Sequence, residues 1–169
     1  MSKLSFCESI QVRCTGFHQS TPAEKYGILP RRMQPEFGFR EHAHTADWEL
    51  EVWAPDLPCL LEQAARGMYS LSGVELKARA AQECSINLHA GDAESLLVRF
   101  LTELLWLQQE KQLGFDRFSI RVDNNYNLQA RLVGAPILKF YKEIKAVTYH
   151  NLAVQTTSQG LRVNIVFDV

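Results

Sequence analysis

The amino-acid sequence predicts an α+β fold, a two-layer sandwich of mostly antiparallel strands with two helices. Two stretches, residues 57–71 and 92–113, carry apolar residues at helical spacing. Residues 48–54 and 83–90 alternate between apolar and polar side chains, the period of two expected of strands, and the last third of the chain is strand-like in character. Two helices and about seven such strands indicate an α+β sandwich.

The composition is that of an ordinary globular protein. Of its 169 residues, 46% are hydrophobic and 22% are charged, and a chain of this length suits one domain. Residues 1–36 contain scattered prolines, glycines and charges with little periodicity, so we expect a poorly ordered leader or a loosely packed extension. The predicted domain is residues 37–169.

The first predicted elements of the domain are two strands and a helix. Residues 37–42 and 48–54 form the strands, and every second residue of the latter is large and apolar. Asp56 is suited to capping a helix that runs to about Leu71, because its carboxylate accepts from the first free main-chain N–H groups. Gly73 follows the end of this helix.

A third strand and the longest helix come next. Residues 83–90 alternate in polarity, and Asp92 then opens a helix predicted to run to about Leu113 and to be closed by Gly114. The apolar stripe of this helix is wide, which predicts that the helix is buried against a sheet.

The last third of the chain is strand-like throughout. Residues 115–122 and 128–133 flank the turn sequence Asp-Asn-Asn, and Gly134-Ala135-Pro136 is expected to break the second strand. The remaining strands are predicted at residues 142–149, 152–157 and 161–169.

Several classes of function find no support in the sequence. The net charge of -1 gives no reason to expect tight binding of nucleic acid or anionic membranes. No apolar run approaches the ~20 residues of a membrane span, and the first residues lack the apolar core of a signal peptide. The four cysteines lack zinc-knuckle spacing and are expected to be thiols. We therefore expect a cytoplasmic protein with no membrane association.

Carboxylates at two distant places form the first candidate site. Asp47 lies between the first two predicted strands. Asp168 and Val169 are the last two residues of the sequence and follow directly on an apolar strand. With the α-carboxylate of Val169, which is ionised at neutral pH, these groups would bring three negative charges into a small volume if they met. Two such charges ~4 Å apart repel by about 4 kcal/mol at an effective dielectric of 20. Calcium, magnesium or manganese would relieve that repulsion. The alternatives are that Asp47 is a turn residue and that Asp168 is solvated.

Histidines and lysines give weaker signals. His42 and His44 face the same side of a strand and could hold a transition metal, although such a pair without a third ligand is more typical of hydrogen-bonded histidines. A stretch with Lys139, Lys142 and Lys145 has aromatic residues between the lysines, so it could contact RNA or a partner, or be a solvated loop.

Nucleophilic catalysis is not indicated. There is no Gly-x-Ser-x-Gly motif, no cysteine beside an evident base and no glycine-rich phosphate loop. We therefore predict no catalytic residue.

Three segments together resemble the archease family. Residues 44–47 resemble the His-Thr-Ala-Asp motif near the start of that family, and residues 145–150 resemble its second signature. Asp168-Val169 resembles its abrupt carboxyl end, and residues 64–68 and 103–107 look like parts of its two helices. The order and spacing fit from about residue 38 to the end.

This resemblance implies a function in RNA processing. Archeases are protein cofactors of the RtcB-type RNA ligase of tRNA splicing and RNA repair, and they promote guanylylation and multiple turnover of the ligase. They bind a divalent metal, typically calcium.

The resemblance also implies roles for particular residues. The metal ligands carried over are Asp47, Asp168 and Val169, the last through main-chain or terminal oxygens. Supporting or partner-contacting roles fall to three further residues, His44, Lys145 and His150. The implied protein is a non-catalytic activator that meets RNA only indirectly or weakly.

The sequence departs from the family pattern in places, and two other functions remain open. Trp48 stands where the family commonly has a small or aliphatic residue, and Asn151 stands where it often has glycine. Asn151 is tolerable there because asparagine accepts the left-handed backbone conformation, and His42 is an additional histidine. The other functions are a metal-dependent phosphoesterase, in which the carboxylates activate water, and a chaperone-like binding module.

Overall fold

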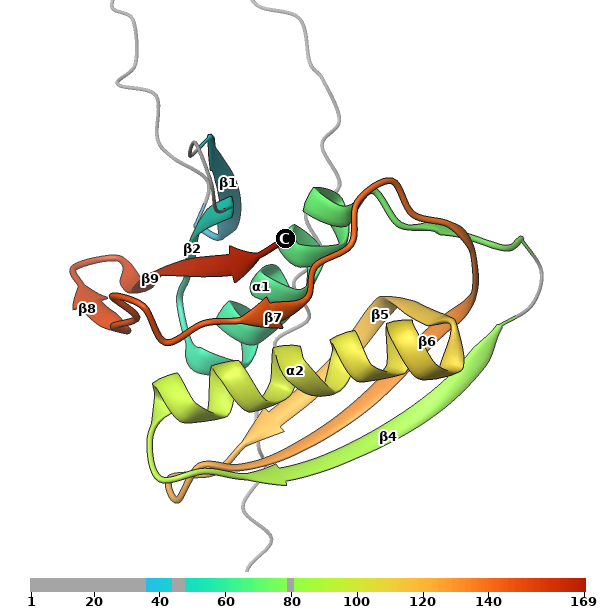
Figure 1. Cartoon of the computed structure of the whole chain (residues 1–169). Helices are drawn as coiled ribbons and strands as arrows, with labels where there is room; N and C mark the ends of the chain where they lie inside the picture. The colour runs from blue at the N-terminus through green and yellow to red at the C-terminus, as the bar shows by residue number, and fades with distance from the viewer. Residues whose placement is uncertain (1–35, 44–47, 79–80) are drawn as a thin grey trace, which may run out of the picture. The chain divides into compact units, whose positions relative to one another are not determined.

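The computed structural model describes residues 36–43, 48–78 and 81–169 (Figure 1). These residues belong to the unit Gln34–Val169. The predicted leader, residues 1–36, lies outside the described residues except for Glu36. His44 and Asp47 lie outside them as well.

The described residues form two helices and nine strands, and every strand pairing is antiparallel. The helices are α1 (Leu57–Ser72) and α2 (Ala93–Lys111). The strands are β1 (Gly38–Ala43), β2 (Trp48–Ala54), β3 (Glu75–Leu76), β4 (Gln82–His89), β5 (Leu113–Val122), β6 (Asn127–Lys139), β7 (Ala146–Val147), β8 (Gln155–Thr157) and β9 (Gly160–Asp168). The predicted α+β class, with two helices and antiparallel strands, is confirmed.

Five of the strands form one sheet. Its order is β1-β2-β9-β7, and β8 pairs with β9 beside β7. The register places Leu50 opposite Ile165 and Val52 opposite Val163, and all four side chains are buried. The alternation seen in the sequence of residues 48–54 therefore reflects one buried and one outward face.

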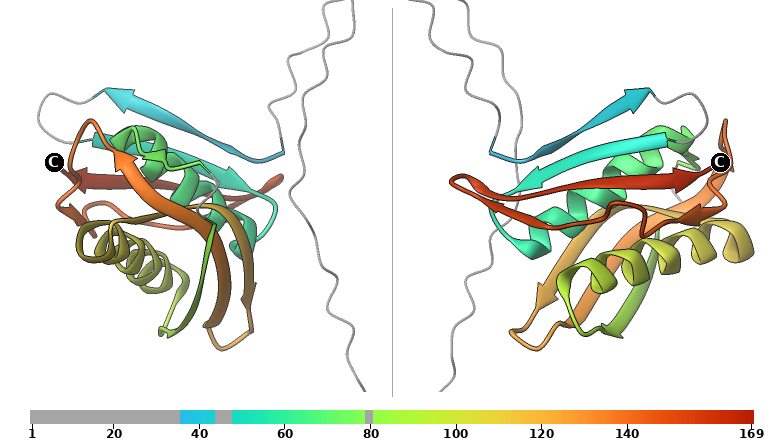
Figure 2. Two further views of the ribbon diagram at one scale, coloured as in Figure 1. Left: turned by 90° about the vertical axis from the view of Figure 1, so that its right-hand side faces the viewer. Right: turned by 60° about the vertical axis from the view of Figure 1, so that its left-hand side comes forward.

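The second sheet is built on β6, which pairs with β3, β4 and β5. Each helix contacts strands of both sheets: α1 packs on β1, β2 and β5, and α2 packs on β4, β5 and β7 (Figures 1 and 2). The largest fully buried side chains come from both helices and both sheets, among them Phe100, Phe167, Leu50, Leu60, Met68, Leu104 and Leu132. The helices thus join the two sheets through one apolar core.

The helix starts were predicted correctly. Asp56 caps α1, with its Oδ1 accepting from the Cys59 N–H at 2.8 Å. Asp92 caps α2 in the same way, accepting from the Ser95 N–H at 2.7 Å. Gly73, with φ of 61°, ends α1 in the left-handed conformation that glycine favours.

The predicted end of α2 at Leu113, closed by Gly114, is wrong. The helix ends at Lys111, and Gln112 takes the left-handed cap with φ of 52°. The Gln112 side chain satisfies the last turn, its Nε2 donating to the main-chain oxygen of Gln109 at 3.0 Å. Leu113 and Gly114 belong to β5, where pairing with β6 outweighs continuation of the helix.

The predicted break at residues 134–136 is also wrong, because β6 runs through them to Lys139. Pro136 has no N–H to donate, but its carbonyl accepts from the Lys77 N–H at 2.9 Å, and the next residue, Ile137, donates to Gln112 O at 2.7 Å. Pro136 itself pairs with Leu113 of β5, and the register shift of this ladder lies further along, between Phe115 and Arg117.

Two predicted strands are much shorter than expected. Only Ala146–Val147 of the predicted strand 142–149 pairs with β9, and only Gln155–Thr157 of the predicted strand 152–157 does. Asn151 separates them with φ of 51°, a left-handed conformation that ends strand geometry.

No helix among the described residues is long and apolar enough to cross a membrane.

Candidate functional site

The end of β9 and the start of β2 lie at the same edge of the five-stranded sheet (Figure 2). Trp48, the first residue of β2, pairs with Phe167, and Asp168 pairs with Ala146 on the other side of β9. Asp168 is exposed and Val169 is half-buried. The structure therefore presents the predicted ligands Asp168 and Val169 at the surface of the sheet edge.

Lys145 holds this end of β9 by two contacts. Its main-chain N–H donates to Asp168 O at 2.8 Å, and its ammonium Nζ donates to Val169 O at 2.9 Å. Lys145, predicted to have a supporting role, therefore directly contacts one of the predicted ligands. Both Asp168 and Val169 offer oxygen atoms, which suit hard cations rather than zinc.

His150 lies in the turn that follows β7. Its main-chain N–H donates to Thr148 Oγ1 at 3.3 Å, and its ring Nε2 is 3.0 Å from Asn151 Nδ2. Thr148 in turn donates its N–H to Val166 O at 3.0 Å, which ties the turn to β9. The contacts of the exposed His150 ring thus lie within its own turn.

The remaining predicted site residues, Asp47 and His44, lie outside the described ranges. Within the ranges 36–43, 48–78 and 81–169, no three His, Cys, Asp or Glu side chains lie together in a way that could hold a metal ion. A site of the predicted composition would depend on Asp47 to complete it.

The side chain of His42 contacts a carboxylate on β2. Its Nε2 is 3.2 Å from Glu51 Oε2, while Arg162 Nη1 donates to Glu51 Oε1 at 2.9 Å. Arg40 lies 3.8 Å from the same carboxylate. His42 therefore belongs to a charged network on the outward face of β1, β2 and β9, the hydrogen-bonded alternative considered from the sequence.

Sequence reasoning missed a contact between Trp48 and Lys142. The Lys142 ammonium lies 3.7 Å from the centroid of the Trp48 ring, within the range of a cation–π interaction. The sequence marked both residues, Trp48 as a departure from the family pattern and Lys142 as part of a basic stretch. No local pattern could pair them, because they lie on separate elements.

The lysines of the basic stretch are engaged within the protein. Lys139 Nζ donates to Tyr141 Oη at 2.8 Å and lies 3.2 Å from Glu75 Oε1. The hydrogen bond to Tyr141, followed by that to Glu75, raises the pKa of Lys139. With Lys142 on Trp48 and Lys145 on Val169, all three lysines have internal partners, which favours a structural role over phosphate binding.

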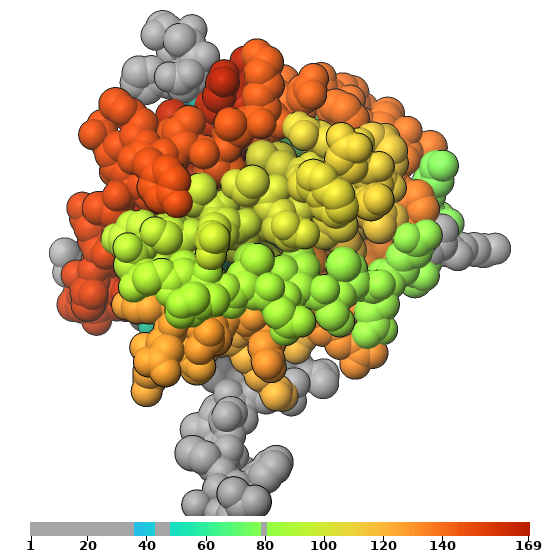
Figure 3. Space-filling view, turned by 60° about the horizontal axis from the view of Figure 1, so that its bottom comes forward, coloured from blue at the N-terminus to red at the C-terminus, as the bar shows by residue number. Residues whose placement is uncertain are grey.

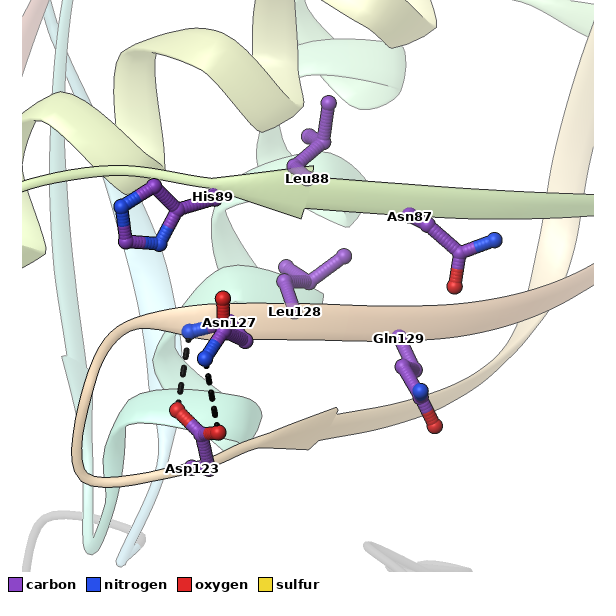
Figure 4. A pocket seen from close by; sticks show the side chains of 7 residues that line it. All are labelled: Asn87, Leu88, His89, Asp123, Asn127, Leu128 and Gln129. Carbon is purple, nitrogen blue, oxygen red and sulfur yellow. Dashed lines mark hydrogen bonds between the residues drawn. The ribbon is translucent and has the colours of Figure 1, made fainter.

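Polar side chains line a shallow hollow on the second sheet (Figure 4), and the hydrogen bonds of Asp123 there have a structural role. Asp123 accepts at Oδ1 from the N–H groups of Asn125 and Asn127, at 2.9 and 3.0 Å, and at Oδ2 from Asn127 Nδ2 at 2.8 Å. The bonds from Asn127, side chain first, hold the pKa of Asp123 below its ordinary value. Asp123 is thereby accounted for as the residue that closes the β5–β6 turn.

A comparison with protein-family models decides the family. The model described as the archease protein family (MTH1598/TM1083) matches residues 39–169. The chain belongs to the archease family. The resemblance drawn from residues 44–47, 145–150 and 168–169 is thus confirmed.

Curated archeases cover most of the chain. Protein archease of Methanosarcina barkeri is 33% identical over 136 residues, which is 75% of this chain and 92% of that protein. A protein archease-like of Drosophila melanogaster is 28% identical over 149 residues, 80% of this chain and 92% of that protein. The similarity extends over archeases of both archaea and an animal.

Solved structures support the archease fold. The solution structure of protein 1598 of Methanobacterium thermoautotrophicum has a TM-score of 0.60 at 23% identity, covering 78% of this chain and 99% of that one. The crystal structure of a Thermotoga maritima protein, described as an archease and possible chaperone, has a TM-score of 0.57 at 23% identity, covering 77% and 94%.

Proposed function

We propose that this archease is a non-catalytic accessory protein that activates an RtcB-type RNA ligase in tRNA splicing or RNA repair. The ligands proposed for its divalent metal are Asp47, Asp168 and the main-chain oxygen of Val169. Activation would consist of promoting guanylylation and multiple turnover of the ligase. An accessory protein can act in this way by binding one state of its partner preferentially.

The register between β2 and β9 is the observation that carries the metal site. Trp48 pairs with Phe167, Asp47 directly precedes Trp48 in the chain, and Asp168 directly follows Phe167. In an antiparallel ladder the residue before one partner aligns with the residue after the other. Asp47 and Asp168 thus flank one paired position in the sequence, which supports their joint role as ligands.

The donors fit a hard cation, calcium first and magnesium or manganese as alternatives. Asp168 supplies an exposed carboxylate, and Val169 supplies an oxygen that the Lys145 ammonium already contacts at 2.9 Å. Lys145 would orient that oxygen and offset part of the negative charge. A bound divalent cation would neutralise the repulsion between the neighbouring carboxylates.

The partner surface is proposed to lie beside this edge. His150 and the neighbouring Tyr149 are exposed, and 59% of Tyr149 is accessible. An exposed tyrosine beside polar groups is typical of residues that anchor a protein interface. RNA would be contacted through the ligase, because the lysines nearby already have internal partners.

The test is a ligation assay with limiting cognate ligase. We expect the wild-type chain to increase turnover, Asp47→Ala to abolish the increase, and Asp123→Ala, whose carboxylate closes a remote turn, to retain it. Circular dichroism would check that each variant is folded. Full stimulation by Asp47→Ala would show that the metal-centred proposal is wrong, and metal-dependent phosphodiester cleavage by the chain alone would favour a phosphoesterase.

One observation favours a second candidate, a chaperone-like module. The exposed large apolar side chains among the described residues are Trp106, Leu138, Phe140, Tyr141 and Tyr149. Four of the five fall within twelve residues of sequence. Trp106 lies on α2, which contacts β7 and borders residues of the last third of the chain on the face shown in Figure 3. Suppression of client aggregation that is unaffected by a chelator would support this function, whereas loss with the chelator would return the activity to the metal site.

A further inference from the structure

The strand β4 lies at an edge of the second sheet and has a regular register along its whole length. It pairs with β6 from Gln82 to His89 without a shift, and no other described strand pairs with it. The strand lies at the surface beside α2 (Figure 3). The main-chain groups of an antiparallel strand point alternately to its two sides. One row of N–H and C=O groups of β4 is therefore open to a further strand.

A hydrogen bond at the end of β4 identifies the residues of this open row. Ala90, the residue after β4, donates its N–H to O of Tyr126, which directly precedes β6. The even-numbered residues of β4 therefore bond to β6. The odd-numbered residues point their main-chain groups to the open edge, and all four are exposed: Glu83, Ser85, Asn87 and His89. Ser85 and Asn87 form the middle of the edge.

β4 lacks the features that keep edge strands unpaired. Natural sheets protect their edges with charged residues, bulges or short strands. Residues 84–88 of β4 carry no charge, and its ladder has no bulge. In the described part of the chain, β1 has charged residues at its centre, β5 has charged residues and a register shift, and the other edge strands have two or three residues. β4 is therefore the described edge strand best suited to pairing with another chain.

The sequence of β4 is complementary to itself about Ile86. In an antiparallel pair with a second copy centred there, Ile86 would face Ile86 and Cys84 would face Leu88. On the solvent-facing side the opposed residues would be polar: Ser85 with Asn87, and Glu83 with His89. Cys84 and Leu88 are half-buried, so pairing would remove their remaining apolar surface from water.

Two charged residues of α2 are complementary about the same centre. Arg99 Nη1 donates to His89 O, which places Arg99 at the end of β4. Glu103 lies toward the start of β4, where burial and then the charge of Glu103 raise the pKa of the Cys84 thiol. Because the second copy would run in the opposite direction, Arg99 of each copy would lie on the side of Glu103 of the other. Two pairs of opposite charge would therefore flank the paired strands.

We propose that two copies of this chain form a symmetric dimer through β4. The strands would pair antiparallel about Ile86 and join the second sheets of both copies into one. Such a two-fold contact uses the open β4 edge of both copies and therefore closes at two. A strand edge with one helix beside it is a small interface, so we expect a Kd on the order of 10 μM. The interface shares no residue with the proposed metal site and is independent of the proposed function.

The first test is sedimentation of the full chain over a concentration range that brackets this Kd. We expect a monomer that converts to a discrete dimer. Ser85→Pro removes an N–H from the open edge and should weaken dimerisation about tenfold or more, because the symmetric contact loses two hydrogen bonds. Ser85→Ala keeps that N–H and should stay within about twofold of wild type. A monomer at every concentration, or equal association of the proline and alanine variants, would overturn the proposal.

Charge reversal on α2 tests the orientation of the two copies. Arg99→Glu and Glu103→Arg should each weaken the dimer about tenfold, because each would bring like charges together twice. A mixture of the two variants should associate like wild type, since the mixed dimer pairs opposite charges at both positions. Misfolding of either variant could not produce this recovery. A mixture that associates as weakly as either variant alone would contradict the proposed pairing.

Amide hydrogen exchange measured by nuclear magnetic resonance locates the interface. The N–H groups of Ser85 and Asn87 point to the open edge, whereas that of Ile86 bonds to β6. We expect exchange at Ser85 and Asn87 to slow as the protein concentration rises, while Ile86 stays protected throughout. If the chain dimerises and exchange at Ser85 and Asn87 does not change, the interface lies elsewhere and the proposal is wrong.

Discussion

At Gly134 the absence of a side chain allows β5 and β6 to pair closely. A Cβ at this position would lie 1.9 Å from Gly114 O and 2.6 Å from Phe115 Cα. Both atoms belong to the main chain of β5, so no side-chain rotation could relieve the overlap. The same stretch carries the register shift beside Phe115, and the glycine therefore serves close approach of two backbones.

We expect Gly134→Ala to destabilise the fold by about 1–3 kcal/mol or more, the usual cost of forcing atoms into a filled space. The measurement is urea unfolding followed by circular dichroism. Gly91→Ala is the matched control, because a Cβ at Gly91 meets nothing within 4 Å, and it should change stability by less than about 0.5 kcal/mol. Equal midpoints for the two variants would show that the strands can move apart at no cost.

Individual residues were predictable where their role is local. Asp56 and Asp92 cap the residues that follow them, and Gly73 ends α1, so short sequence windows contain the whole interaction. Trp48 and Lys142 are different, because their contact depends on how β2 and the segment after β6 meet in space. The sequence likewise predicted a supporting role for Lys145 but could not show that its ammonium contacts Val169 O.

Elements were predictable where periodicity and caps agree, and less so where pairing decides. Residues 48–54 form β2 with the bounds that alternation predicted. The strand β6 continues through Pro136 because Lys77 and Gln112, next to the neighbouring strands, supply the hydrogen bonds around it. The Gly-Ala-Pro sequence does not reveal these partners. Residues 142–149 are strand-like in sequence, yet only Ala146–Val147 pairs with β9, and hydrogen bonds to Ser72 and Gln109 fix Lys142 and Ile144.

The start of α2 carries a pH dependence that can be measured. The Ser95 N–H bond holds the pKa of Asp92 below its ordinary value. A lowered folded-state pKa gives stability that is present above the unfolded pKa, about 3.9, and is lost as pH falls through the folded value. We expect wild type to lose melting temperature more steeply than Asp92→Asn below about pH 4, because asparagine caps without titrating.

Asp92→Ala is the control for this titration. It lacks the cap at every pH, so its melting temperature should lie below that of Asp92→Asn by a constant amount from pH 2.5 to about pH 6. If Asp92→Asn follows wild type throughout the acid range, the capping carboxylate does not contribute to acid unfolding.

At the scale of the whole molecule, the candidate site depends on chain connectivity rather than on one motif. Asp47 precedes β2 in the sequence, Asp168 ends β9, and Lys145 precedes β7, and these strands are neighbours in one sheet. Motif spacing in the sequence predicted the members of the site. Sheet order, which places β9 between β2 and β7, brings the strands that carry or follow these distant motifs side by side.

Metal binding to the folded chain should therefore raise the stability of the entire molecule. A ligand that binds only the folded state stabilises it by about 2.7 kcal/mol at a hundredfold excess over its Kd. For a protein of this size each kcal/mol raises the melting temperature by about 2–4 °C. We expect calcium to raise the melting temperature of wild type accordingly, measured by calorimetry against a sample with chelator. Asp47→Ala and Asp168→Ala should lose this increase because each removes a proposed ligand. Asp123→Asn, which alters a carboxylate of the β5–β6 turn, should keep it. An undiminished increase in Asp47→Ala would place the bound calcium elsewhere and separate the metal from this edge of the sheet.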